Sequence, residues 1–276
     1  VFRYLLKPCS PDDLRLAVDQ AVAAHANYRV APPRKVARIS VDDGLRSLRI
    51  AMQPIYACHD GALYAHEALL RLPDHPDATV EDLLDEATHC DRLWELERTV
   101  RGVVATRMWE RPGDSLVFVN LHPNSLLDPQ LYTASDPLAS HTAVVVLEIT
   151  ERGSLDQVDD LQARVAALRA MGYKVAIDDM GSGYSGLTTF TTILPDFVKF
   201  DRELIREAYG TPAKHKLVSS IAGVCRELDI ATIAEGVEDQ RDLDEARAMG
   251  CTMVQGYLLG RPAMEFRHGR SHEWPT

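Results

Sequence analysis

The stretch 143–178, AVVVLEITERGSLDQVDDLQARVAALRAMGYKVAID, decides the fold class of this chain. It opens with a run rich in valine, 143–149, and closes with a second apolar run, 174–178. Between them, 155–171 carries apolar residues at helical spacing. A strand, a helix and another strand in this order are typical of a parallel sheet covered by helices, so the stretch predicts an α/β fold.

The same alternation extends in both directions from this stretch. Further helical patterns lie at 212–229 and 239–249, and the predicted strands are 48–57, 63–71, 115–121, 143–149, 174–178, 196–200, 231–235 and 253–257. Eight strands with helices between them over about 230 residues predict a TIM-like (β/α)₈ barrel.

The first two predicted strands break the pattern of strand and helix. Only His59, Asp60 and Gly61 separate them, so we expect an antiparallel hairpin. We take 63–71 as the antiparallel strand, which places Glu67 in the middle of a strand rather than at its end.

A separate N-terminal segment precedes the barrel. VFRYLLK (1–7) ends at Pro8, and Ser10 has the character of an N-cap before an amphipathic helix. Residues 1–30 thus resemble the last strand and helix of a response-regulator receiver domain, although a plain linker helix fits the same pattern. We predict this helical extension at 1–30, a proline-containing linker at 31–39, the barrel at 40–268 and a C-terminal tail at 269–276.

Composition restricts the function classes. The 276 residues include 30 Lys and Arg against 41 Asp and Glu, a net charge of −11, which argues against duplex nucleic acid as a partner. No apolar run reaches the ~18 residues of a membrane span, and we see no signal peptide. The five cysteines lie far apart without a CxxC pair, which predicts reduced, structural thiols in a cytoplasmic protein.

Polar residues collect where the predicted strands end, the edge where such barrels carry their chemistry. One polar residue there is usually a helix cap or turn former, but these occur together: Glu67, Asn120, Glu148, Asp178, Asp179, Lys199, Asp201, Glu235 and Gln255. Carboxylates that converge repel one another unless cations neutralise them. Oxygen ligands without a His or Cys cluster favour Mg²⁺ or Mn²⁺ over Zn²⁺.

The adjacent Asp178 and Asp179 could serve two metal ions, one of them by bridging. Two such ions act on attacking and leaving oxygens in phosphoester displacement, so the residues indicate phosphoryl chemistry without naming a substrate. The glycine-rich segment 181–186 follows directly and would allow a loop to move.

Eight short motifs in order carry a family resemblance. They are Gln53-Pro54-Ile55, Glu67-Ala68-Leu69 with Arg71, Val119-Asn120-Leu121, Glu148-Ile149-Thr150-Glu151, Asp178-Asp179-Met180-Gly181, Leu194-Pro195-Asp196 through Lys199, Glu235-Gly236-Val237-Glu238 and Gln255-Gly256-Tyr257. Over about 40–265, the chain resembles the EAL-domain phosphodiesterases of bacterial cyclic di-GMP. The resemblance implies metal-dependent hydrolysis to linear pGpG and a homodimer. The separate resemblance of 1–30 to a receiver tail implies an upstream receiver domain and a histidine kinase.

The resemblance also implies roles for individual residues. Glu67, Asn120, Glu148 and Asp178 would hold the first metal, and Asp178 with Asp179 the second. Lys199 and Glu235 would position and deprotonate the attacking water, with Gln255 beside them. Gln53 and Leu69 would line the nucleotide pocket, Arg71 would contact a phosphate, and Glu67 would also contact the substrate. Asp201 and Glu238 would be supporting carboxylates, and Glu151 would tether the loop after the paired aspartates.

Three positions depart from the family. Met180 stands where Phe is usual, and Ser182 and Gly186 differ in the following loop, so loop order is in question. No proposed ligand or base is lost, and we expect excess Ca²⁺ to inhibit. Two alternatives stay open: a catalytically silent cyclic di-GMP receptor, and a scaffold that binds protein partners.

Overall fold

The computed structural model describes residues 39–150, 155, 158–180, 186–208, 211–271 and 274. The chain divides into two units, Val1–Ala37 and Arg38–Thr276, and the description concerns the second. The predicted extension at 1–30 and nearly all of the linker lie outside the described residues, as do Glu151 and 181–185.

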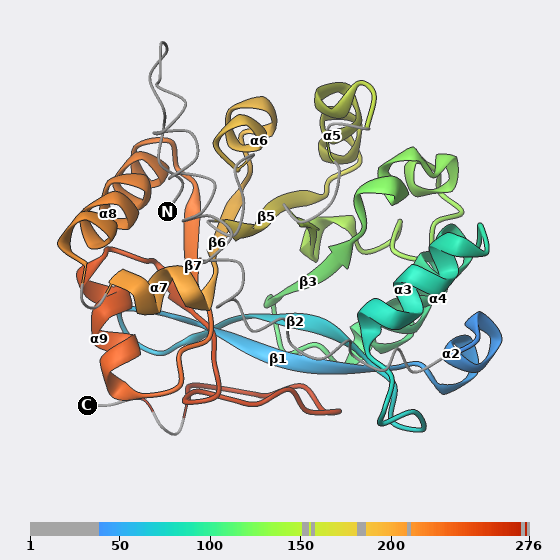
Figure 1. The fold of residues 1–276 in the computed structure, drawn as a ribbon, viewed down its shortest axis with the longest axis horizontal. Helices are drawn as coiled ribbons and strands as arrows, with labels where there is room; N and C mark the ends of the chain where they lie inside the picture. Colours follow the sequence, from blue (N-terminus) through green and yellow to red (C-terminus); the bar gives the residue numbers. More distant parts are fainter. Residues whose placement is uncertain are drawn as a thin grey trace, which may run out of the picture. The chain divides into compact units, whose positions relative to one another are not determined.

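The strands form a closed barrel in sequence order (Figure 1). They are β1 (Arg49–Ala57), β2 (Leu63–Arg71), β3 (Leu116–Leu121), β4 (Val145–Thr150), β5 (Lys174–Met180), β6 (Phe197–Phe200), β7 (Ala231–Ala234) and β8 (Met253–Val254). The predicted TIM-like barrel and its antiparallel first hairpin are confirmed. The reversed strand, however, is β1, which is antiparallel to both β2 and β8. Our expectation for 63–71 was wrong, because β2 pairs in parallel with β3 and so shares the direction of the other strands.

Helices surround the barrel and connect its parallel strands (Figure 1). They are α2 (Val41–Ser47), α3 (Val80–His89), α4 (Leu93–Arg107), α5 (Leu161–Ala170), α6 (Gly186–Ile193), α7 (Arg202–Ala208), α8 (Pro212–Glu227) and α9 (Gln240–Ala248). Short 3₁₀ turns are η1 (Met108–Glu110), η2 (Pro123–Leu127), η3 (Pro129–Tyr132) and η4 (Thr142–Val144). Within the described ranges, no helix is long and apolar enough to cross a membrane.

Local sequence explains where several helices begin. Thr79 and Asp82 form a reciprocal capping box at the start of α3, which satisfies backbone donors that the first helical turn leaves unpaired. Helix α5 begins at Leu161, later than the predicted 155, because Asp160 has a φ of 55°. A residue in the left-handed region cannot continue a right-handed helix.

One apolar residue from each strand fills the barrel interior. These eight buried side chains form their own cluster, and they are Ile55, Ala65, Phe118, Val146, Ala176, Phe197, Ile233 and Met253. Phe118 and Phe197 meet edge to face with their ring centroids 5.0 Å apart. The interior is therefore a packed plug, and any ligand must bind above this layer.

A buried charge network fixes α4 to the segment after β3. Arg101 is 1% exposed, and its Nε donates to Asp136 at 2.8 Å while Nη2 reaches Asp128 at 3.3 Å. Arg98 also binds Asp128 through two hydrogen bonds. Both aspartates have buried carboxylates, so removing one partner would leave uncompensated charge. This network holds the helix that forms one wall of the site.

Candidate active site

A polar layer lies directly above the apolar plug. In a strand, residues two positions apart point to the same side. On β2–β8, a polar residue follows each residue of the apolar plug by two positions, either within the strand or just after its end. On β1, which runs in the reverse direction, the polar residue comes two positions before the plug residue. These side chains are Gln53, Glu67, Asn120, Glu148, Asp178, Lys199, Glu235 and Gln255. The barrel thus presents a polar ring at its C-terminal mouth, and Glu67 faces inward although it lies in mid-strand.

Lys199 connects the carboxylates of this ring. Its Nζ lies 2.7 Å from Glu148 Oε1 and 2.8 Å from Glu235 Oε1. Asp178 Oδ1 is 3.1 Å away and Glu67 Oε2 is 3.4 Å away. The lysine is 1% exposed, so its ammonium interacts with the carboxylates with little screening by water.

Two amides complete the ring around Glu67. Asn120 Nδ2 donates to Glu67 Oε1 at 3.1 Å, and Gln255 Nε2 donates to Glu67 Oε2 at 2.6 Å. Each amide therefore turns its nitrogen to the carboxylate and keeps its oxygen available as a ligand or acceptor.

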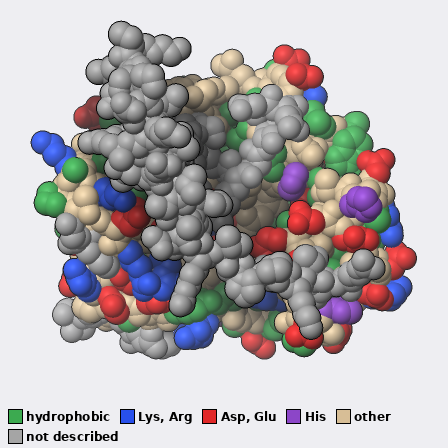
Figure 2. Space-filling view, viewed as in Figure 1, with side chains coloured by type: hydrophobic (Ala, Val, Ile, Leu, Met, Phe, Trp, Pro, Cys, Tyr) green, Lys and Arg blue, Asp and Glu red, His purple; other side chains and the backbone are tan. Residues whose placement is uncertain are grey.

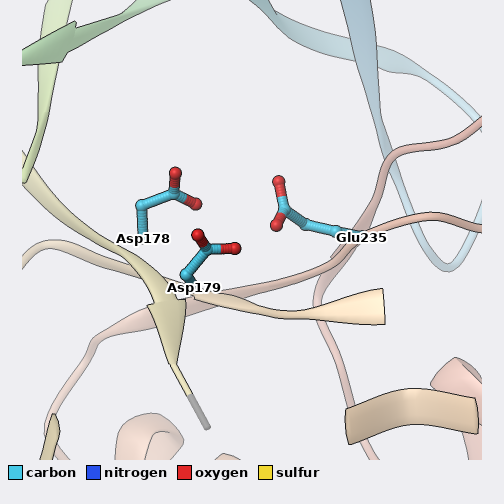
Figure 3. Close-up of side chains that lie close together, drawn as sticks. All are labelled: Asp178, Asp179 and Glu235. Carbon is cyan, nitrogen blue, oxygen red and sulfur yellow. The ribbon is translucent and has the colours of Figure 1, made fainter. Parts of the chain in front are cut away.

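An irregularity in β5 allows adjacent aspartates to serve one site. Neighbouring residues of a regular strand point to opposite faces. The register of β5 against β6 shifts between Ile177 and Met180, and Asp179 has a φ of 56°. As a result, Asp178, Asp179 and Glu235 direct their carboxylates toward one another (Figure 3), with candidate ligand atoms within 4.8 Å.

Burial and like charge shift the protonation of this cluster. Burial is the largest influence on Glu235 and raises the pKa of that carboxyl to about 8, although Lys199 opposes the shift. Burial also raises the pKa of Glu148 well above its usual range. The Lys199 pKa is raised instead, because the attraction of Asp178, Glu148, Glu235 and Glu67 outweighs burial.

The ring fits hard divalent cations. Apart from the Lys199 ammonium, no donor in the described part of the chain satisfies either buried oxygen of Glu148 or Asp178 Oδ1. Gln255 Oε1 is likewise buried without a hydrogen-bond donor. Unsatisfied carboxylate and amide oxygens are the ligands that Mg²⁺, Mn²⁺ and Ca²⁺ take.

A cavity of about 540 Å³ opens beside the ring, between the barrel mouth and the helices α3 and α4. Leu69, Arg71 and Asn120 line it from the barrel, and Leu84 and Val100 from the helices. In the space-filling view, acidic side chains with histidines among them gather over α3 and α4 (Figure 2). The cavity therefore offers an apolar wall edged with carboxylates.

A smaller cavity of about 200 Å³ adjoins the other side of the ring. Gln53, Glu235, Glu238 and Tyr257 contribute to its lining, together with Arg202. Arg202 Nη2 lies 2.6 Å from Glu238 Oε2, so the carboxylate of Glu238 is already neutralised by an ion pair. The two cavities share Glu67 and flank the carboxylate cluster.

The structure gathers most of the predicted site residues, with two exceptions. Asp201 lies at the start of α7, where its Oδ1 accepts a hydrogen bond from the backbone N–H of Glu203 at 2.6 Å. That contact is a helix cap, and among the described residues Asp201 lines neither cavity. The proposed loop tether, Glu151, lies outside the described residues.

Glu97 and His122 are among the side chains of the larger cavity that sequence reasoning missed. Glu97 sits in the middle of α4, where nothing in the helical pattern separates a cavity residue from a surface one. Burial raises the pKa of Glu97 to about 7. His122 follows Asn120 by two residues, so its position next to a predicted ligand was an available signal.

Comparisons with known proteins agree with this geometry. Residues 39–262 match the EAL domain family. The cyclic di-GMP phosphodiesterase RocR of Pseudomonas aeruginosa is 28% identical over 225 residues, which are 77% of this chain and 57% of RocR. MucR of the same organism, a bifunctional diguanylate cyclase and cyclic di-GMP phosphodiesterase, is 30% identical over 79% of this chain and 33% of its own length. The chain thus spans less than two thirds of these curated relatives.

Solved structures show the same fold. The cyclic di-GMP complex of the MucR phosphodiesterase superposes with a TM-score of 0.69 and 28% identity, covering 79% of this chain and 97% of that one. BlrP1 of Klebsiella pneumoniae, solved with calcium and cyclic di-GMP, gives a TM-score of 0.73 at 26% identity, covering 97% of this chain and 70% of that one. The ordered motifs, the closed barrel and the matched span all agree: the chain belongs to the EAL domain family.

Proposed function

We propose that this chain hydrolyses cyclic di-GMP to linear pGpG with the aid of two divalent cations, Mg²⁺ or Mn²⁺. The observation that carries the proposal is the polar ring, in which four carboxylates, three amides and Lys199 meet at the barrel mouth with Asp179 beside them. Relatives named as cyclic di-GMP phosphodiesterases support the choice of substrate.

The residues that would hold the cations lie at the barrel mouth, and two of them, Glu148 and Asp178, have buried oxygens without a hydrogen-bond donor other than Lys199 among the described residues. Glu67, Asn120, Glu148 and Asp178 would hold one cation, and Asp178 with Asp179 would hold a second. Glu235 lies close enough to this pair to contribute an oxygen. When bound, the cations supply positive charge to the phosphate oxygens and lower the pKa of water.

The proton of the attacking water goes to the Glu235 carboxylate in this proposal. Its raised pKa makes it a stronger base than an ordinary glutamate, and Lys199 at 2.8 Å favours the ionised form that can accept the proton. The water oxygen forms a bond to phosphorus, the bond to the 3′ oxygen breaks, and that oxygen leaves with a proton. The product has a 5′ phosphate and a 3′ hydroxyl, which is linear pGpG.

The two cavities account for the size of the substrate. One nucleotide fits the larger cavity beside Leu69 and Arg71, whose guanidinium suits a phosphate oxygen. The second fits the smaller cavity beside Gln53 and Tyr257. The scissile phosphate then lies between the two cavities, at the carboxylate cluster.

Chromatography of reaction products tests the proposal. The protein is incubated with cyclic di-GMP and Mg²⁺, Mn²⁺ or Ca²⁺, and formation of pGpG is followed. We expect turnover with the first two and inhibition by excess Ca²⁺, which prefers longer bonds and more ligands. Glu235→Ala should abolish turnover yet keep the nucleotide bound, and Arg71→Ala should weaken binding. Binding without product under every condition would establish the silent receptor instead, and no binding at all would favour the scaffold.

We further propose that the chain acts in the cytoplasm as a homodimer, controlled by an upstream receiver domain and its histidine kinase. The described cysteines Cys58, Cys90, Cys225 and Cys251 are free thiols, as a reducing compartment maintains. The resemblance of 1–30 to a receiver tail supports the regulation. This regulation is tested by deleting residues 1–30 and comparing the turnover with that of the full-length natural protein, each with and without a phosphoryl donor. Equal rates in all conditions would show that the segment is only a spacer.

A further inference from the structure

His122 places a fixed hydrogen-bond donor in the larger cavity. It follows β3 directly, and its Nδ1 accepts a hydrogen bond from the backbone N–H of Asn124 at 3.1 Å. A ring nitrogen that accepts carries no proton, so the proton of the neutral ring is on Nε2. Within the described part of the chain, no hydrogen bond engages Nε2, and the ring lines the cavity. The donor is therefore available to a ligand.

The neighbours of this donor are acceptors. Glu97 Oε2 accepts from the backbone N–H of His122 at 3.4 Å, and the Glu97 and His122 side chains line the same cavity. Asp85 on α3 also lines the cavity and lies close enough to act electrostatically on the ring. Carboxyl groups repel phosphate, so the part of a nucleotide that fits here is the uncharged base. Leu84, Leu96 and Val100 supply apolar contacts for its faces.

A donor next to acceptors matches one edge of guanine. Guanine presents an acceptor, the oxygen O6, beside a donor, N1–H. Adenine presents the opposite order, with an amino group at position 6 and an unprotonated N1. A base that reverses donor and acceptor leaves buried polar groups of both partners unpaired, which costs more than the loss of one contact.

We propose that His122 is a specificity-determining residue whose Nε2–H reads O6 of a guanine in the larger cavity, with the neighbouring carboxyl groups accepting from N1–H. This inference rests on the proposed function, because it assigns a base to the cavity in which one nucleotide of cyclic di-GMP would bind. It goes beyond that function by naming the side chain that distinguishes guanine from adenine.

Calorimetric binding of cyclic di-GMP and cyclic di-AMP, each with Ca²⁺ and with EDTA, tests the proposal on the whole chain. His122→Ser removes the donor but keeps a hydroxyl that can cap η2. His122→Asn keeps both a cap and an amide donor. His89→Ser is the matched control, because His89 is exposed at the end of α3 and does not line the cavity.

We expect His122→Ser to bind cyclic di-GMP about tenfold more weakly or worse, the size of effect that one base-reading contact has. Binding of cyclic di-AMP should not weaken, so the ratio of the two affinities falls. His122→Asn should lie between the wild type and His122→Ser, and His89→Ser should match the wild type. An unchanged ratio for His122→Ser, whether both affinities stay or both fall together, overturns the proposal.

A measurement on the wild type keeps the test independent of variant folding. With ¹⁵N-labelled histidine, the Nε2–H signal of His122 should shift downfield on adding cyclic di-GMP or its inosine analogue, which keeps O6 and N1–H, but not on adding cyclic di-AMP. No shift with either purine that carries O6 overturns the role of His122. Failure of the proposed function looks different: a wild type that binds cyclic di-GMP without hydrolysing it would refute the hydrolysis and leave the reading of O6 intact, whereas a wild type that binds no cyclic di-GMP would refute the choice of substrate.

Discussion

Replacing Lys199 by Met should expose how much the carboxylate cluster depends on one ammonium. The Nζ lies between 2.7 and 3.4 Å from Glu67, Glu148, Asp178 and Glu235, and the side chain is 1% exposed. Methionine has a similar length and no charge, so the substitution removes the cation and leaves little empty space. Removing one partner of a buried ion pair costs about 3–5 kcal/mol of unfolding free energy.

Protonation sets the pH dependence of this loss. The folded-state pKa of Glu235 is about 8, above its unfolded value, so the folded protein binds a proton that the unfolded chain releases. Stability from this group is therefore present at low pH and declines as pH rises through the folded pKa. Without Lys199, which opposes the upward shift, the decline should be steeper. We expect the deficit of Lys199→Met to grow between pH 5 and pH 8.

Urea unfolding in EDTA, at pH 5 and pH 8, measures both effects. Added Mg²⁺ should reduce the deficit, because bound cations replace the missing charge. The matched control is Lys214→Met, whose ion pair with Glu207 is exposed on the surface and contributes at most about 1 kcal/mol. If Lys199→Met were as stable as Lys214→Met in EDTA at pH 8, the cluster would not need the ammonium and our account of its electrostatics would be refuted.

Further predictions concern the backbone and the wall of the site. Asp179→Ala should be less stable in EDTA than Asp179→Asn by about 1 kcal/mol, because alanine tolerates a φ of 56° less well than asparagine. Equal urea midpoints of the two variants would contradict a strained backbone, and neither variant should hydrolyse cyclic di-GMP. Gly236→Ala should lower kcat by about 100-fold, because its Cβ would lie 2.5 Å from Arg202 Cβ and displace the preceding catalytic carboxylate; unchanged kinetics would show that the turn adapts. Arg101→Met should cost about 3–5 kcal/mol of unfolding free energy by leaving its buried carboxylate partners unpaired, and a urea midpoint equal to that of the wild type would count against this network.

Much of the barrel could be predicted because each strand has a recognisable local pattern of apolar residues. The runs at 63–71 and 174–178 match β2 and the first part of β5, and the alternation of strand and helix follows from hydrophobic period alone. Strand direction was harder. Which member of the hairpin is reversed depends on pairing with β3 and β8, both far along the chain, so 63–71 was assigned wrongly.

The chemistry of the site was also visible in the sequence as residue types at strand ends. What the sequence did not reveal is how Asp178 and Asp179 share one site, since adjacent strand residues should diverge. Their convergence requires the register shift against β6 and the left-handed φ of Asp179, which depend on packing between strands. Glu97 and His122 were missed because a helix and a turn enter the cavity only when α4 packs beside the barrel.

The sequence by itself determined which side chains share one side of a regular strand. A polar residue two positions from an apolar one on the same strand shares its side, whatever the strand pairs with. Only the tertiary structure decided that these side chains meet. Gln255 and Glu67 are 188 residues apart and form a 2.6 Å hydrogen bond because β1 pairs with β8 and closes the barrel. Closure sets four carboxylates around Lys199, since it turns a row of strand ends into a ring with a common centre.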